Sequence, residues 1–177
     1  LTDYINKNHP VQKAILDQIM GYANLEKLST AIDGCSAPTP FLTLSIIAGM
    51  FQKLASGNYP ELDRLYNAMS KHPYLIGGRE TFDTDFITAM KGRAVCKVGG
   101  EAIRGFGIRK EDGSVLGIVV KVLDGNLRAL GSAVMAFLNQ MELLTDDENE
   151  SLKHYREPVL KNHRKLEVGK ISTSIDF

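Results

Sequence analysis

The sequence predicts an α+β fold with an antiparallel sheet, because the spacing of its apolar residues changes about half-way along the chain. In residues 1–92 apolar side chains recur at the spacing of amphipathic helices, which predicts a helical block. In residues 93–144 three short runs rich in valine, isoleucine and glycine predict a three-strand meander, followed by a long helix. Residues 145–177 are expected to form a tail. Helices first and sequential strands afterwards are typical of an α+β domain.

Four helices are expected in the first block, over residues 11–22, 41–55, 60–69 and 83–90. Pro10 is well placed at the start of the first helix, because its fixed φ suits the first turn. Asp83 is in a position to cap the fourth. Residues 33–40 contain two prolines and a glycine, which predict a loop without regular structure.

The strands of the second block are expected over residues 94–97, 102–108 and 115–122, and its helix over residues 127–144. A hairpin-type turn at residues 111–114 joins the last two strands, and Asp124 or Asn126 would cap the helix. In the tail, residues 145–150 are acidic, and residues 161–170 are basic and expected to be exposed. A three-strand meander does not easily bury both of its faces, so we expect the sheet to continue with strands outside this chain.

Length and composition predict a single soluble, cytoplasmic domain of 177 residues and 19.5 kDa. Lysine plus arginine (21) balances aspartate plus glutamate (21), so no charge excess favours a nucleic-acid or membrane-surface partner. No apolar run approaches the roughly 20 residues that span a bilayer. The chain begins with Leu1 and shows no signal-peptide pattern, so we expect it to be processed or to be one piece of a larger polypeptide.

Lys97 is the first candidate for chemistry. It lies inside a predicted strand and is followed by Gly99 and Gly100, whose small size lets a ligand or a catalytic helix approach the backbone. A Lys-X-Gly strand is the pattern by which serine β-lactamases and penicillin-binding proteins place a cation beside their nucleophile. The alternative is an exposed lysine that protects a sheet edge.

The two cysteines have different expected roles. Cys35 lies in an Asp-Gly-Cys-Ser-Ala-Pro-Thr segment, where its thiolate could bind zinc or where turn residues merely shape a helix-entry loop. Cys96 precedes Lys97 in a strand, so its side chain should point to the opposite face and act as a small core hydrophobe. We expect no disulfide bond between the two cysteines, which in any case give at most one bridge.

Taken in order and spacing, five motifs resemble the asparaginase II family, the thermolabile, rhizobial-type L-asparaginases. The matching segments are residues 9–12 (His-Pro-Val-Gln), 33–39 (Asp-Gly-Cys-X-X-Pro-Thr), 68–84 (Ala-Met-X-X-His-Pro, then Gly-X-X-X-Phe-Asp-Thr), 97–102 and 121–129 (Lys-X-X-Asp-Gly-X-X-Arg-Ala). The resemblance runs from Tyr4 to about Ser172. One segment departs from the family pattern, because Lys-X-Gly-Ala-Glu-Gly reads Lys-Val-Gly-Gly-Glu-Ala at residues 97–102.

The resemblance implies a β-lactamase/penicillin-binding/glutaminase-like fold, of which this chain would be the C-terminal part. It implies hydrolysis of L-asparagine to L-aspartate and ammonia by Ser-Lys pairs, with the Ser-X-X-Lys tandem in an N-terminal half that this chain lacks. No Ser-X-X-Lys occurs in the 177 residues, so the chain alone is expected to be inactive. A serine hydroxyl is a weak nucleophile that needs a neighbouring base, which a desolvated lysine can supply.

Individual roles follow from the same resemblance. Lys97 would be that base, or the cation that holds the substrate carboxylate, and backbone N–H groups around Val98 and Gly99 would stabilise an oxyanion. Glu101 and Arg128 are candidate anchors for the charged ends of asparagine. Lys121 is a weaker one, and surface ion pairing explains these basic residues equally well. The chemistry requires no cofactor, but Cys35 would bind zinc together with a cysteine and a lysine of the missing half.

Two other classes of function stay open on the same fold: a non-catalytic protein that binds a small molecule, and a zinc-anchored structural protein. The expected partners are L-asparagine and the missing N-terminal half, with no nucleic acid and no membrane. The preference for asparagine over glutamine and the oligomeric state, for which a homodimer is one option, do not follow from the sequence.

Overall fold

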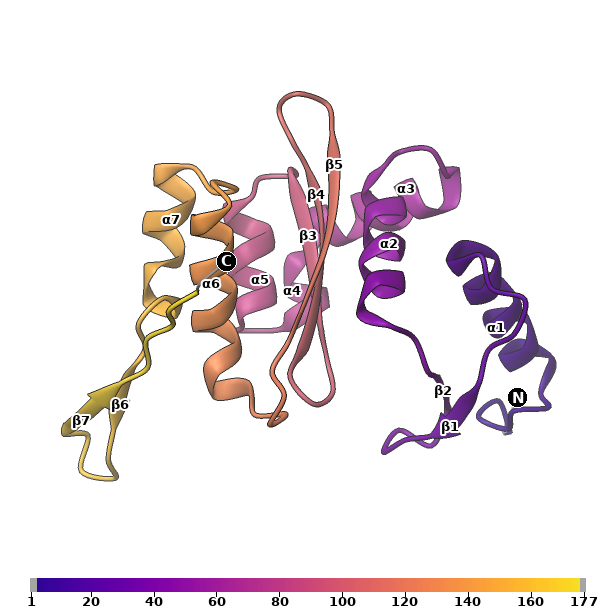
Figure 1. Ribbon diagram of the computed structural model, residues 1–177, viewed down its shortest axis with the longest axis horizontal. Coiled ribbons are helices and arrows are strands. Elements are labelled where there is room, and N and C mark those ends of the chain that lie inside the picture. Colours follow the sequence, from indigo (N-terminus) through magenta and orange to yellow (C-terminus); the bar gives the residue numbers. More distant parts are fainter. Residues whose placement is uncertain (1–2, 176–177) are drawn as a thin grey trace.

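The computed structural model describes residues 3–175, which fold around a three-stranded antiparallel sheet with helices on both of its faces (Figure 1). The strands are β3 (Ala94–Gly99), β4 (Ile103–Arg109) and β5 (Val115–Lys121), in the order β3-β4-β5. Lys97 lies opposite Gly105, which in turn lies opposite Val119. The predicted α+β class and the predicted meander are both confirmed.

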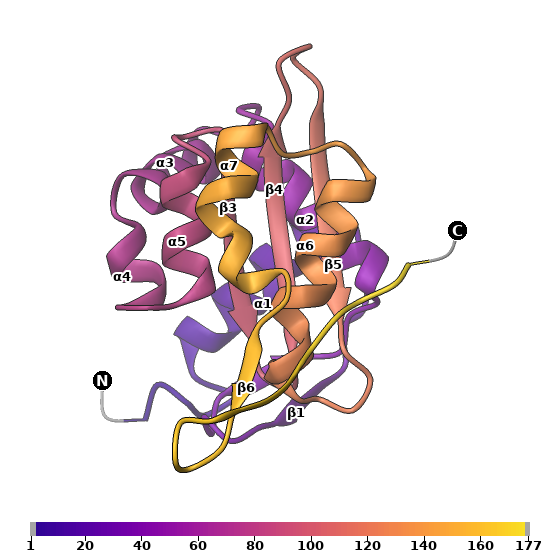
Figure 2. The same cartoon turned by 90° about the vertical axis from the view of Figure 1, so that its left-hand side faces the viewer.

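The helices form two layers. The helices of the described residues are α1 (Pro10–Ala23), α2 (Leu44–Ala55), α3 (Pro60–Lys71), α4 (Pro73–Gly77), α5 (Phe82–Ala89), α6 (Leu130–Gln140) and α7 (Asp146–Leu152). Single 3₁₀ turns are η1 (Leu127–Ala129) and η2 (Lys153–Tyr155). Helix α2 covers one face of the sheet and carries α1 on its outer side. Helices α5, α6 and α7 lie in front of the other face in Figure 2.

Three glycines let α2 approach the sheet closely. A Cβ on Gly105 would overlap the ring of Phe51, and a Cβ on Gly107 would lie 2.6 Å from the carbonyl oxygen of the same residue. A Cβ on Gly117 would overlap the backbone carbonyl of Ala48. The glycines that weaken the strand pattern in the sequence are therefore the residues that seat the helix.

Side chains of the strands alternate between two cores. Cys96, Phe106 and Ile108 are fully buried with the apolar residues of α5 and α6. Val95, one position along β3, is buried in a separate cluster with Leu54 and Tyr66 on the α2 side. This alternation follows from the pleat of a strand, in which neighbouring residues point to opposite faces. Each face of the meander thus has its own apolar cover.

Several expected boundaries are wrong. Residues 33–40 are not free of regular structure, because β2 (Pro38–Pro40) pairs with β1 (Thr30–Ile32). The helix expected over 127–144 is a 3₁₀ turn followed by α6, and α4 was not expected. Residues 145–177 were expected as a tail, but they include α7 and a projecting hairpin of β6 (Val159–Lys161) and β7 (Glu167–Lys170). Thr145 begins α7 with a capping box, and the Thr-X-X-Glu spacing of residues 145–148 is its signal in the sequence.

The β5 strand lies at an edge of the sheet, since within residues 3–175 it pairs with β4 alone. All seven residues of β5 are half-buried. The expected continuation of the sheet by strands outside this chain, along the edge of β5, stays a prediction. Within the same described part of the chain, no helix has the length and apolar character needed to cross a membrane.

Candidate active site

The lower end of the sheet in Figure 1 brings together three of the sequence-predicted site residues. Lys97 and Gly99 lie at the end of β3, and Glu101 lies in the turn that joins β3 to β4. In that turn Glu101 and Ala102 have φ of 58° and 51°, in the left-handed region that residues other than glycine seldom adopt. Ala102 stands where the family pattern has glycine, so this departure places a strained alanine in the turn that follows the strand of the candidate lysine.

Lys97 points away from the buried core of α5 and α6. Its side chain is 49% exposed, and Nζ donates a 2.9 Å hydrogen bond to the carbonyl oxygen of Val98. Nζ also lies 3.9 Å from Oδ2 of Asp83. Cys96 is fully buried on the opposite face, as predicted from the alternation of the strand. Lys97 is therefore an amine at the rim of the sheet, reachable from outside.

Asp83 is the residue that sequence reasoning assigned wrongly. It does not cap α5; the side chain of Thr81 does, by accepting the N–H of Thr84. Asp83 lies inside the helix and is 1% exposed. Its Oδ1 accepts a 2.8 Å hydrogen bond from Nε of Arg104, itself 7% exposed. The available signal was its place in a stretch of core residues, where a carboxylate needs a buried partner.

The backbone N–H of Val98 is not free to stabilise an oxyanion, contrary to our expectation. It donates a 2.9 Å hydrogen bond to Oδ2 of Asp83. The absence of a side chain at Gly99 also has a local structural reason, because a Cβ there would lie 2.7 Å from the side chain of Ile103. The structure therefore explains both positions through the packing of β3 and its turn, independently of any ligand.

Burial raises the pKa of the Cys96 thiol well above its ordinary value, and the negative charge of Asp83 adds to this effect. The thiol lies 3.4 Å from Oδ1 of Asp83 and serves as a weak donor. The two cysteines are free, Cys96 buried and Cys35 exposed, which confirms that no disulfide joins them. Cys96 is thus an inert core residue rather than a nucleophile.

The basic anchors predicted downstream occupy the same end of the sheet. Nζ of Lys121 donates hydrogen bonds to the carbonyl oxygens of Glu101 and Val122, the second at 3.0 Å. Lys121 therefore holds the backbone of the β3–β4 turn. The side chain of Glu101 packs against Gly125, where a Cβ would overlap its carboxylate. Arg128 is exposed on η1, and its backbone N–H is held by the Asn126 side chain, which is the predicted cap.

Cys35 lies apart from these residues, in the exposed turn between β1 and β2. Its backbone N–H donates a 2.8 Å hydrogen bond to Oδ1 of Asp33. Hydrogen bonds from the side chains of Cys35 and Thr39 lower the pKa of the Asp33 carboxyl. Within residues 3–175 no group of three histidine, cysteine, aspartate or glutamate side chains is arranged to hold a metal ion. The described residues therefore do not form a complete zinc site.

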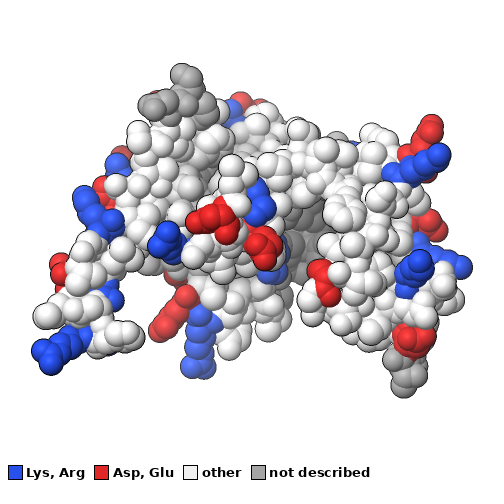
Figure 3. All heavy atoms as spheres, turned by 60° about the horizontal axis from the view of Figure 1, so that its bottom comes forward, with Lys and Arg blue, Asp and Glu red and all other residues white. Residues whose placement is uncertain are grey.

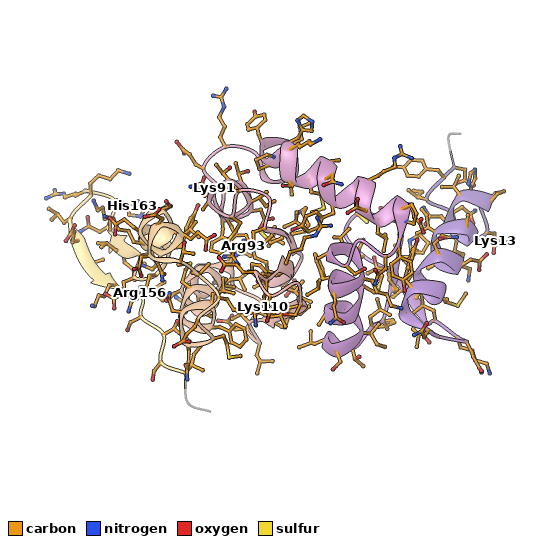
Figure 4. All side chains as sticks on the ribbon, turned by 90° about the horizontal axis from the view of Figure 1, so that it is seen from above. Lys13, Lys91, Arg93, Lys110, Arg156 and His163 are labelled. Atoms are coloured by element: carbon orange, nitrogen blue, oxygen red, sulfur yellow. The ribbon has the colours of Figure 1, made fainter. Side chains whose placement is uncertain are left out.

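Figure 3 shows the lower face of the molecule, which is hollowed between the body around the sheet and the lobe of α1, β1 and β2. Side chains of both signs lie at the rim of the hollow. A cavity of about 760 Å³ lies elsewhere, between α5, α7 and the β4–β5 hairpin. Arg93 and Lys91, labelled in Figure 4, line it, but Arg93 is occupied by a 2.6 Å ion pair with Glu148 and by the carbonyl oxygen of Leu143. That cavity is better explained as the seam between α5 and α7 than as a catalytic pocket.

The fold and the site describe an α+β protein with a surface amine at the edge of its sheet and a buried ion pair behind it. The family model described as L-asparaginase II matches residues 1–173. The chain therefore belongs to the L-asparaginase II family, and this membership indicates an amidohydrolase that acts on a small substrate such as asparagine. A search of curated proteins found no match.

Proposed function

We propose that this chain carries part of the active site of an L-asparaginase, which hydrolyses L-asparagine to L-aspartate and ammonia by a Ser-Lys mechanism. The position of Lys97 carries the proposal. An amine on an edge strand, half-exposed and facing away from the core, is accessible to both a nucleophile and a substrate. The family match and the Lys-X-Gly strand support the same reading. The wider fold would be β-lactamase-like, with the sheet continued along the open edge of β5.

In this mechanism a serine from outside these 177 residues attacks the side-chain carbonyl of asparagine. Lys97, as the neutral amine, accepts the serine proton as the new C–O bond forms. Collapse of the tetrahedral intermediate breaks the C–N bond, and ammonia leaves with a proton returned by an acid such as the Lys97 ammonium. Water then hydrolyses the acyl-enzyme and releases aspartate. In the alternative role, Lys97 stays protonated and holds the substrate α-carboxylate.

Glu101 and Arg128 are proposed to bind the α-ammonium and α-carboxylate of the substrate, and Gly99 to leave room for it. Glu101 is exposed in a turn whose backbone is fixed by Lys121, and its carboxylate lies against Gly125. Arg128 is exposed at the start of the α6 segment. The Val98 N–H is left out of the oxyanion role, because it is bonded to Asp83.

Ammonia release from L-asparagine, measured on the complete polypeptide with its serine-bearing residues, tests the proposal. We expect ammonia and aspartate in equal amounts. Binding of asparagine without ammonia release would favour the non-catalytic binding protein instead, and neither binding nor release would favour a structural protein.

Cys35 is proposed to bind zinc together with a cysteine and a lysine from outside this chain. Full structural zinc sites contribute roughly 10–16 kcal/mol, far more than one thiolate supplies. We therefore expect the isolated chain to be metal-free, with an exposed Cys35 that reacts readily with a thiol reagent. In the complete protein we expect about one zinc per subunit and protection of Cys35. Metal analysis of wild type and Cys35→Ala checks this, and zinc content unchanged by the substitution would remove Cys35 from the ligands.

A further inference from the structure

A single buried carboxylate contacts three consecutive residues of the strand that carries the candidate lysine. Asp83 accepts hydrogen bonds from the thiol of Cys96 and the backbone N–H of Val98, at 3.4 and 2.9 Å. The residue between them, Lys97, places its Nζ 3.9 Å from the same carboxylate. Asp83 thus connects α5 to β3 at Lys97, the residue that carries the surface amine.

Arg104 neutralises this carboxylate from the neighbouring strand. Its Nε lies 2.8 Å from Oδ1 of Asp83, and its guanidinium lies 4.2 Å from the centroid of the Phe82 ring. Buried ion pairs are poor sources of stability, because desolvation offsets most of the attraction, and apolar replacements often serve as well. A buried pair placed directly behind a surface amine therefore invites an explanation beyond folding.

Lys97 also has other ionisable groups on the segments around it. From α2 the charged residue is Lys53, which donates to the carbonyl oxygen of Tyr22, and α6 carries no charged residue. Ionisable groups of the other neighbouring segments include Cys96, Glu101, Lys121, Asp85, His154 and Tyr155.

Two of these groups stay uncharged near Lys97, and two others are bonded elsewhere. Burial raises the pKa of the Cys96 thiol and, with the hydrogen bond to Asp85, the pKa of the Tyr155 hydroxyl, so both stay protonated near neutral pH. His154 faces Asp85 at 3.6 Å rather than Lys97. Lys121 is bonded to backbone carbonyls of the turn.

We propose that Asp83 and Arg104 are positioning residues for Lys97: Asp83 fixes the strand beneath the amine, and Arg104 cancels the negative charge that would otherwise hold the amine protonated. The inference rests on the proposed function, in which Lys97 must be neutral to accept a proton from serine. A carboxylate 3.9 Å away favours an ammonium. The guanidinium on the far side of that carboxylate offsets this preference.

The two partners have opposite expected effects on the pH dependence of the complete enzyme. Asp83→Asn keeps an oxygen for the Val98 N–H but leaves the positive Arg104, so the acid limb of the kcat/KM profile should move to lower pH. Arg104→Met leaves the negative Asp83, so the acid limb should move to higher pH. We expect shifts of about one pH unit, at the lower end of the effect of a nearby charge. The acid limb reports the essential base of the free enzyme.

The double variant Asp83→Asn/Arg104→Met carries no unpaired charge and should fold where a single variant fails. We expect its acid limb at the wild-type pH and its kcat within about threefold of wild type, because Asn still binds Val98. Glu148→Gln, which breaks the comparable Arg93–Glu148 pair at the other end of the sheet, is the matched control and should leave the limb unmoved. A purely structural role is indicated if all variants lose kcat with an unmoved limb, and this outcome overturns the proposal.

Acetylation of Lys97 by acetic anhydride as a function of pH, read by mass spectrometry, gives a measurement independent of turnover. The Lys97 reactivity profile should shift to lower pH in Asp83→Asn and to higher pH in Arg104→Met. If wild type releases no ammonia but these shifts occur, the proposed function fails and the role of the pair stands. Identical labelling profiles in active wild type and both variants would overturn the role of the pair alone.

Discussion

Lys97→Ala in the complete polypeptide is expected to lower kcat for asparagine hydrolysis by at least 100-fold while leaving the fold intact. General-base assistance typically contributes ~10²–10⁴ to rate. The side chain is half-exposed, and its amine donates a 2.9 Å hydrogen bond to the carbonyl oxygen of Val98 and lies 3.9 Å from Asp83. Lys97 belongs to neither apolar core, so its loss opens no cavity there. Steady-state kinetics, with thermal unfolding of the same samples, checks both halves of the expectation.

Lys110 provides the matched control. Its side chain is 40% exposed and its Nζ lies 3.5 Å from a carboxylate of Asp112, so its exposure resembles that of Lys97, but its partner carboxylate is itself exposed. It lies at the opposite end of the sheet, beside the β4–β5 hairpin. Lys110→Ala should therefore leave kcat within about twofold, as surface substitutions usually do. A Lys97→Ala enzyme with more than about a tenth of wild-type kcat would remove Lys97 from the chemistry.

Local patterns predicted the parts of the fold that depend on neighbouring residues. The helix start at Pro10, the three strands and the opposite orientation of Cys96 and Lys97 all follow from spacing, capping and pleat. The pairing of β1 with β2 depends instead on the backbone of residues 30–40 folding back on itself. The prolines of that segment predicted a loop instead of a strand, although β2 accommodates them in a short edge pairing.

The candidate site was only partly predictable for a similar reason. A Lys-X-Gly strand is visible in the sequence, but the group behind it is not. Asp83 and Arg104 are 21 residues apart and meet only because α5 packs on β3. An aspartate near a helix start is most often a cap, and this preference led to the prediction that Asp83 caps α5. In the structure Thr81 caps α5, and Asp83 is buried toward β3 because α5 packs on that strand.

Gly117→Ala is expected to destabilise the complete protein by about 3 kcal/mol or more, the upper range for overpacking a core. A Cβ at this position would overlap the carbonyl oxygen of Ala48 and would lie 2.6 Å from the backbone nitrogen of Gln52. Both are backbone atoms of α2, so no side-chain rotation relieves the clash. The helix itself must move away from β4 and β5, where Gly105 and Gly107 also hold it close. Denaturant unfolding of variant and wild type gives the difference directly.

The same helix offers a control of opposite sign. Gly49 lies inside α2, and a Cβ there has no neighbour within 4 Å. Gly49→Ala replaces a poor helix former by the best one and should stabilise the protein by about 0.5–1 kcal/mol. The two substitutions add the same methyl group at the same layer, one on the strand and one on the helix. If both have similarly small effects, α2 does not pack on the glycine face of β4 and β5 as closely as the structure shows.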